Sequence, residues 1–378
     1  MMTCLYGKSG DEVCQVRARV VIEEGSNEEA FHVFQLMKTI VMVALVATVW
    51  APAALSAPPP LSQELQETLD AIRTDPRPRA LVKDTHYVIS NEPKQWLFRE
   101  VLETPGAIYL GVGAEQNYLF IGWSRPEVAI LMDFDELIPR LHDVYAAIFR
   151  RADNPEAFLA SWTRANQEVV KGWIEEDYEP PRSDGAQRAW KFSRRRVERH
   201  LAKLVNRYTE RGMPIFLTDL EQYTYVRGLV RSGRVRAVRG DVTKKSTMAD
   251  IAAFARKACM PIRTLYLSNV EGYISFYNQN YRRNILGLPG DEHSVVLHTD
   301  PSGKNTYRYM VTPLSIYREW IQCQCIYRIT VVRRHYVPHG DDGLSTIEKR
   351  PLDVPKMVKK TKRQGPGPAM GLPEICPK

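Results

Sequence analysis

The sequence predicts an α/β domain built on a doubly wound, mostly parallel sheet. Two observations lead to this fold class. Between about residues 84 and 315, short apolar runs alternate with amphipathic stretches of ten or more residues. Glycines or acids stand where several of these apolar runs end. Strands separated by helices of this length pair in parallel through right-handed crossovers, with helices on both faces of the sheet.

The expected strands and helices follow from apolar periodicity along the chain. In 136–152, for example, apolar residues recur at the spacing of one helix face. Strands are expected at 107–113, 128–135, 214–219, 234–241, 264–271, 294–300 and 307–313. Helices are expected from about Glu115 and over 136–152, 221–233, 248–258 and 273–286. A mostly helical insertion is expected at about 150–213.

The N-terminal part of the chain indicates export. Residues 37–57 contain a positive Lys38, an apolar core and a small-residue cleavage region, the three parts of a signal peptide. Residues 1–36 have three basic residues against six acids, so we interpret them as a non-native upstream extension. Prolines interrupt the apolar stretch, which argues against the alternative of a membrane anchor. We therefore expect a periplasmic or extracellular protein with no membrane span after signal cleavage.

The mature chain is expected to hold one domain between two less ordered segments. Residues 58–83 form a linker with a short helix, and 84–340 form the α/β domain with its helical insertion. Residues 341–378 are basic and rich in Pro and Gly, which predicts a disordered tail.

Four cysteines remain after signal cleavage: Cys259, Cys323, Cys325 and Cys376. They are too few for a disulfide framework in a chain of this size. The Cys323-Gln-Cys325 spacing is tighter than that of zinc sites, so no metal site is expected. The stretch 323–337 is expected to be a strand, and the pairing of Cys323 with Cys325 stays open.

Four strand ends carry the candidate site residues. They are Gly111 and Gly113, Asp133 and Asp135, Asp241, and Ser268 with Asn269. Because parallel strands end at one edge of a sheet, these residues should converge there on a ligand. Glycines allow close backbone approach, and a carboxylate can accept both hydroxyl protons of a ribose. The alternative for Asp135 and Asp241 is helix capping.

The order of these strand ends resembles that of class I S-adenosylmethionine-dependent methyltransferases. The resemblance covers about residues 84–315 and implies a methyltransferase-like Rossmann fold with S-adenosylmethionine as cofactor. It places the methionine over Gly111 and Gly113 and the ribose at Asp133 or Asp135. It places the adenine at Asp241 and the methyl group near Ser268 and Asn269. "GVGAEQN" and "SNVE" also resemble motifs of an uncharacterised bacterial family with this fold.

The sequence departs from the methyltransferase pattern at Tyr109 and Glu115. The family has an acid at the first position and a third glycine at the second. Glu115 would repel a carboxylate if it pointed into the pocket, and it would be a helix-start residue if it pointed away. Three hypotheses follow: an exported fold that binds a nucleoside-type or other small ligand and has lost activity, an active methyltransferase of unknown acceptor, and a non-enzymatic binding or structural module.

Charge and missing motifs exclude other classes. Residues 182–211 have ten Lys and Arg against three acids, a net charge of +7. Their apolar residues recur at helical spacing, so the basic side is expected to be a solvated helix face, with phosphate or anionic lipid as the alternative. No nucleic-acid-binding motif accompanies it, and no specific nucleic-acid binding is expected. The chain also lacks G-x-S-x-G, P-loop and H-E-x-x-H motifs.

Overall fold

A mixed sheet of eight strands forms the centre of the computed structural model, which describes residues 57–303, 306–340, 343–354 and 375–376. The sheet order is β3-β2-β1-β4-β5-β6-β8-β7. The strands are β1 Ile108–Val112, β2 Val128–Asp133, β3 Val235–Arg239, β4 Ile262–Ser268, β5 Val295–Gly303, β6 Thr306–Pro313, β7 Val337–His339 and β8 Leu344–Thr346. The upstream extension and the signal-peptide core lie outside the described residues.

Five successive strands, β3-β2-β1-β4-β5, pair in parallel. The strand order reverses between β1 and β4, so a crevice is expected beyond their carboxyl ends. The α/β class is confirmed, but the sheet is mixed. β6 runs antiparallel to β5, β8 runs parallel to β6, and β7 runs antiparallel to β8.

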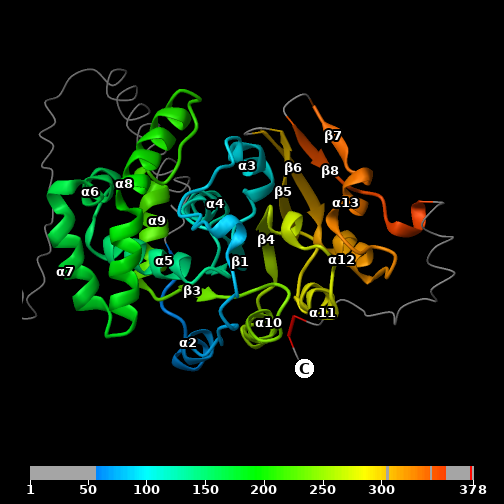
Figure 1. Cartoon of the computed structure of the whole chain (residues 1–378), viewed down its shortest axis with the longest axis horizontal. Coiled ribbons are helices and arrows are strands. Elements are labelled where there is room, and N and C mark those ends of the chain that lie inside the picture. The colour runs from blue at the N-terminus through cyan, green and yellow to red at the C-terminus, as the bar shows by residue number, and fades with distance from the viewer. Residues whose placement is uncertain (1–56, 304–305, 341–342, 355–374, 377–378) are drawn as a thin grey trace, which may run out of the picture. The chain divides into compact units, whose positions relative to one another are not determined.

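Helices cover both faces of the sheet (Figure 1). One face carries α3 Arg99–Leu102, α4 Gln116–Ser124, α5 Leu137–Arg151, α6 Pro155–Ser161, α7 Gln167–Asp177, α8 Arg182–Thr209 and α9 Leu220–Arg231. The other face carries α2 Gln63–Asp70, α10 Thr247–Lys257, α11 Gln279–Gly287, α12 Leu314–Gln322 and α13 Ile329–Val332. None of the helices among the described residues is long and apolar enough to cross a membrane.

The alternation of side chains in the central strands explains the two-sided core. Tyr109 and Leu131 point to the face that α4 and α5 cover, whereas Leu110 and Ile130 point to the opposite face. All four are at most 1% exposed. Strands buried on both faces need apolar residues at every position, and β1 and β2 supply them.

Charged pairs attach the helical insertion to α5. Asp143 on α5 accepts from Arg182 at the start of α8, with 2.6 Å between Nη2 and Oδ1, and from Arg140 at 2.7 Å. Asp177 at the end of α7 pairs with Arg150 and Arg151. These contacts, together with the apolar face of α8, hold the insertion against the domain.

Two predicted strands are not strands. Residues 214–219 form a turn, because Asp219 caps α9 by accepting from the Gln222 amide at 2.8 Å. Ile215 and Phe216 in that turn are fully buried, which explains their apolar character. Residues 323–337 hold a turn closed by the Cys323–Cys325 disulfide, followed by α13 and a 3₁₀ turn.

The helix expected at 273–286 is shorter in the structure, and two short strands lie where none was expected. The helix α11 begins only at Gln279, where Asn278 caps it. β7 and β8 were not expected, and β8 lies in the tail for which the sequence predicts disorder, so that prediction is wrong for Leu344–Thr346. Most of the remaining tail lies outside the described residues, although Cys376 forms a disulfide with Cys259.

Replacing Leu131 by Ala should destabilise the protein strongly, because Leu131 is fully buried in the second strand of the sheet. We expect a loss of about 2–5 kcal/mol in the free energy of unfolding, measured by urea denaturation. Val169→Ala is the control, since Val169 is 48% exposed and should change stability by less than about 0.5 kcal/mol. Similar effects of the two substitutions would contradict the two-sided core.

Candidate functional site

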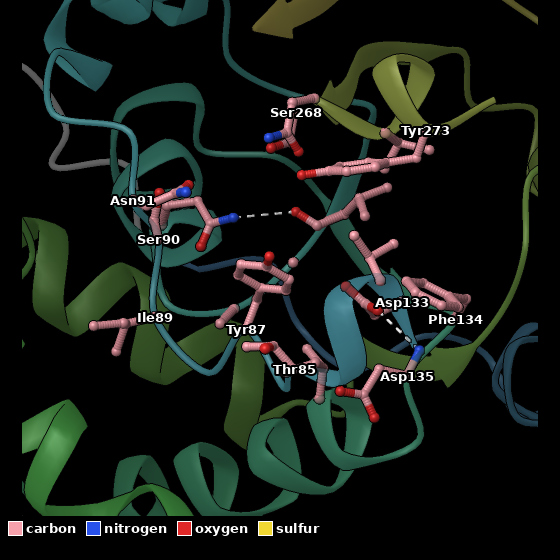
Figure 2. Close-up of a pocket in the computed structure, with 18 residues that line it drawn as sticks. Thr85, Tyr87, Ile89, Ser90, Asn91, Asp133, Phe134, Asp135, Ser268 and Tyr273 are labelled. Atoms are coloured by element: carbon pink, nitrogen blue, oxygen red, sulfur yellow. Dashed lines mark hydrogen bonds between the residues drawn. The ribbon is translucent and has the colours of Figure 1, made fainter. Parts of the chain in front are cut away.

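Two adjoining cavities lie at the carboxyl ends of β1, β2, β3 and β4. The first has a volume of about 90 Å³ and the second about 450 Å³. They share the walls formed by Val82, Val112, Phe134, Val270 and Tyr273. Figure 2 shows the first cavity, with the segment 85–91 on one side and the ends of β2 and β4 on the others.

The turn from β1 into α4 forms the floor of the first cavity. The side chain of Asn117 closes this turn. Its Nδ2 lies 3.3, 3.0 and 2.9 Å from the carbonyl oxygens of Val112, Gly113 and Ala114, and its Oδ1 accepts from the Tyr109 hydroxyl at 2.7 Å. Buried carbonyls need such partners, so Asn117 fixes the shape of the turn.

The two predicted glycines are required by the packing and the backbone conformation of this turn. A Cβ on Gly111 would lie 2.0 Å from Asn117 Oδ1, so only glycine fits there. Gly111 does not line either cavity. Gly113 lines the first cavity and has a φ of +96°, which favours glycine. A Cβ at Gly113 would meet the Gln116 side chain at 2.4 Å.

His142 on α5 stabilises the turn by a hydrogen bond to its backbone. Its Nε2 lies 2.8 Å from the Gly113 carbonyl oxygen and its Nδ1 lies 3.0 Å from the Tyr118 hydroxyl. A neutral ring satisfies both contacts, with Nε2 donating and Nδ1 accepting. Burial lowers the pKa of His142 to about 4, so the ring stays neutral at physiological pH.

Asp133 presents a carboxylate to the first cavity at the end of β2. Its Oδ1 accepts from the backbone amide of Asp135 at 2.9 Å, and it forms no ion pair with any described residue. Burial raises the pKa of Asp133 to about 7. A half-buried carboxylate without a cation is suited to accept hydrogen bonds from a ligand.

Asp135, in contrast, is engaged by the protein. Its Oδ2 lies 2.7 Å from His86 Nδ1, and its Oδ1 accepts from the Leu137 amide at the start of α5. The capping alternative therefore holds for Asp135, although it still lines the first cavity. The His86 ring in turn packs edge-on against Phe192 of α8, with 5.1 Å between ring centroids.

The end of β4 forms the opposite wall. Ser268 has a φ of +51°, unusual for a residue with a side chain, and its hydroxyl donates to Glu92 Oε1 at 2.5 Å. Tyr266 and Thr299 donate to the same buried carboxyl group at 2.5 Å each. Burial raises the pKa of Glu92, against the effect of these hydrogen bonds. Glu92 therefore orients Ser268 at the cavity wall.

Two tyrosines extend into the first cavity from opposite walls, as Figure 2 shows for Tyr87 and Tyr273. Asn269, the second predicted residue of this wall, lines the first cavity together with Tyr273. Both rings are well exposed, at 39% and 47%. Aromatic side chains at the mouth of a polar cavity favour a planar or apolar ligand group.

A buried network supports the 3₁₀ helix η4 (Val270–Tyr273), which forms the wall shared by the two cavities. Glu271 accepts from Tyr281 at 2.8 Å and from Tyr317 at 2.5 Å, and it pairs with His298 on β5. Burial opposes the ionisation of Glu271, but His298 and the tyrosine hydroxyls outweigh it and lower its pKa. The network holds η4 in place and does not line either cavity.

Asp241 lines the second cavity at the end of β3. Its Oδ1 accepts from the Thr243 amide at 2.8 Å and from the Thr243 hydroxyl at 2.7 Å, which makes it a turn-forming residue. Gly240, Val242 and Phe276 lie on the same cavity. The predicted residues thus divide between the cavities: Gly113, Asp133, Asp135, Ser268 and Asn269 line the first, and Asp241 lines the second.

The two departures from the methyltransferase pattern have structural explanations. Tyr109 is buried and donates to Asn117. Glu115 points away from the cavities into the core, where it accepts from the Ser90 amide at 3.0 Å and lies 2.6 Å from His200 Nε2 of α8. Its carboxylate therefore does not repel an anionic group of a ligand in the cavities. Through these two contacts Glu115 connects the helical insertion to the segment 85–91.

Sequence reasoning missed that segment and Gln116. Residues 85–91 precede β1 and line the first cavity through Thr85, Tyr87, Ile89, Ser90 and Asn91. Their alternation of inward and outward residues was the only available signal. Gln116 also lines the cavity, and its Oε1 is buried without a hydrogen-bond partner among the described residues. An acceptor of this kind needs a donor from water or from a ligand.

His142 should make stability depend on acid. The folded-state pKa of about 4 lies below the ordinary 6.5, so unfolded chains bind a proton that folded chains do not. Stability should be intact above pH 6.5 and should fall by about 3 kcal/mol in total as the pH drops to about 4. Urea denaturation of wild type and His142→Gln across this range measures the difference. Parallel pH profiles would contradict a neutral His142.

Asp133 should have the opposite pH dependence. Its folded-state pKa of about 7 lies above the ordinary 3.8, so ionisation of Asp133 destabilises the folded state as the pH rises between these values. Asp133→Asn should therefore raise the melting temperature at pH 8 and give a smaller gain at pH 5. Asp184→Asn, at an exposed position of α8, is the matched control and should give no such difference. A lower melting temperature for Asp133→Asn at pH 8 would overturn this.

The comparisons with known proteins give a family and no function. No curated protein matches the chain. Within the described residues, no group of three or more His, Cys, Asp or Glu side chains is placed to hold a metal ion. The family model described as "Domain of unknown function (DUF7790)" matches residues 87–348. This range is more than half of the chain and includes the ends of the strands that form both cavities. The chain therefore belongs to the DUF7790 family.

Proposed function

We propose that the two cavities together bind a nucleoside-type small ligand, with S-adenosylmethionine and its demethylated product as the first ligands to test. The observation that carries the proposal is a pair of acceptors in the first cavity that receive no hydrogen bond from any side chain among the described residues. Asp133 has no cation partner among the described residues, and Gln116 Oε1 has no hydrogen-bond partner there. A ligand rich in hydroxyl and amino donors would satisfy both.

The cavity dimensions support a ligand that spans both sites. At about 450 Å³ the second cavity is in the range of ligand pockets, about 300–1,000 Å³, whereas the first is narrower. The ribose hydroxyls bind Asp133. The base lies in the second cavity beside Phe134 and Asp241, and the ligand's amino-acid chain extends over Gly113 towards Gln116.

The parallel part of the sheet supports a methyltransferase-like Rossmann fold as the finer description. The order β3-β2-β1-β4-β5, with its reversal between β1 and β4, is that of a doubly wound nucleotide-binding sheet. Asp133 and Asp241 stand at the ends of β2 and β3, the positions at which the resemblance puts the ribose and the base. Ser268 and Asn269 stand at the position that faces the transferred group, and no catalytic residue is assigned.

Export remains part of the proposal, and the cysteines support it. All four cysteines of the mature chain form disulfides, Cys259 with Cys376 and Cys323 with Cys325. Disulfides persist in oxidising compartments. An exported protein meets little cytosolic S-adenosylmethionine, so we propose ligand binding with activity lost, and active methyl transfer as the second candidate.

Isothermal titration of the full chain with S-adenosylmethionine and S-adenosylhomocysteine tests the ligand. We expect heat with at least one of them, and Asp133→Asn should weaken binding by about 10- to 100-fold, because a hydrogen bond to a charged group contributes about 1.5–3 kcal/mol. Circular dichroism establishes that both proteins are folded.

Asp184→Asn is again the matched control, since the exposed Asp184 lies outside both cavities and should leave affinity unchanged. No heat with either ligand from folded wild-type protein would remove S-adenosylmethionine from the proposal. Equal affinities for wild type and Asp133→Asn would instead remove the assignment of the ribose to Asp133.

A further inference from the structure

The solvent face of α8 carries a dense group of cations. Six exposed basic residues lie within sixteen residues of this helix: Arg188, Lys191, Arg195, Arg196, Arg199 and Lys203. At 1.5 Å per residue they span about 24 Å. At 100° per residue they fall on one side of the helix, opposite the buried Val197, Leu201 and Leu204. We call these six residues the basic face.

The basic face has few counter-charges among the described residues. None of its six residues forms an ion pair with a described residue. Glu198 on the same helix is bound by Arg194 at 3.0 Å, and Glu175 of the neighbouring α7 accepts from Gln187 at 2.8 Å. The acids Glu168 and Asp184 lie in the groove beside one end of the basic face. Mutual repulsion among unpaired cations is unfavourable, so the basic face is complementary to an external anionic surface.

An exposed aromatic side chain lies among these cations. Phe192 is 50% exposed, and the guanidinium of Arg196 lies over its ring, 5.8 Å from the centroid. The other side of Phe192 contacts His86. Cations that surround one exposed aromatic residue on a helix are typical of helices that bind the interface of an anionic membrane.

The shape of the basic face favours a planar surface over a nucleic-acid strand. The six residues project from one side of one uninterrupted helix of 28 residues, so a flat layer of headgroups can contact them together. A single strand would instead need a basic groove. The groove of about 680 Å³ between α7 and α8 contains the acids Glu168 and Asp184 beside Arg188, Lys191 and Arg195, so it is not a uniformly basic groove.

We propose that the basic face docks the protein on an anionic phospholipid surface. The headgroup phosphates pair with the Lys and Arg side chains, and Phe192 inserts at the level of the headgroups. The apolar side of α8 stays in the protein core, so the contact is peripheral and largely electrostatic. This docking is independent of the nucleoside-type ligand proposed above, because none of the six residues lines the two cavities.

Vesicle cosedimentation with the full chain tests the docking. The protein should bind vesicles of phosphatidylcholine mixed with phosphatidylserine and should not bind pure phosphatidylcholine. Binding should be largely lost at about 1 M NaCl, where the Debye length falls to about 3 Å. The triple variant Lys191→Glu, Arg195→Glu, Arg199→Glu should bind at least roughly 100-fold more weakly, since each lost cation costs roughly fivefold.

The matched control changes the same charges elsewhere. Arg231, Lys244 and Lys245 are exposed and form no ion pair with a described residue, so their triple replacement by Glu should retain most of the binding. Phe192→Ala should reduce the part of the binding that survives salt by roughly threefold to tenfold. Circular dichroism verifies the fold of each variant.

Three outcomes would overturn the docking. Folded wild-type protein could fail to bind the anionic vesicles. The two triple variants could lose binding equally, which would indicate a general effect of net charge. A fluorescently labelled single-stranded oligonucleotide could bind in an α8-dependent manner while the vesicles do not, and this would assign the basic face to nucleic acid.

Discussion

The side-chain amide of Asn117 holds the turn between β1 and α4, and both cavities depend on the shape of that turn. Three consecutive carbonyl oxygens of the turn, those of residues 112–114, converge on its Nδ2. Its Oδ1 accepts a hydrogen bond from the Tyr109 hydroxyl. The space for these contacts exists because position 111 has no Cβ. His142 then fixes the Gly113 carbonyl from the other side. These contacts within the protein account for the conformation of the turn, and Gly111 is required by its packing against Asn117.

Buried carboxyl groups next to the cavities are compensated in different ways. Glu92 receives three hydroxyl donors, Glu115 receives a backbone amide and His200, and Glu271 receives His298 with tyrosine hydroxyls. Burying such a group without partners would cost several kcal/mol. Asp133 is different, because its carboxylate accepts hydrogen bonds from backbone amides and from no side chain in the described part of the chain. This difference separates a candidate ligand group from the structural acids.

The helical insertion contributes to the site and to the surface. His200 and Phe192 of α8 contact the segment that forms one cavity wall, through Glu115 and His86. The same helix turns its basic face to solvent. The helix α8 thus contacts segment 85–91 on one side and carries the basic face on the other, so the proposed docking surface and the proposed ligand site lie on neighbouring parts of the molecule.

The sequence by itself determined the α/β class and most elements of the parallel sheet. Apolar runs such as 128–135 and the helical spacing in 136–152 reflect burial on both faces of strands and one face of helices, which local periodicity records. It also placed Asp133, Asp241 and Ser268 at strand ends, because parallel strands end at one edge.

Only the tertiary structure decided which side chains are engaged there. Asp135 pairs with His86, which lies 49 residues away in the sequence, so local sequence could not show that its carboxylate is engaged. Likewise, the space left by the missing Cβ of Gly111 is filled by the side chain of Asn117 and does not admit a ligand. Residues 214–219 have the composition of a strand but form a turn, since a helix cap at Asp219 and burial of Phe216 satisfy them without a partner strand. The short strands β7 and β8 carry little periodic signal, and only the pairing of β8 with β6 and of β7 with β8 defines them.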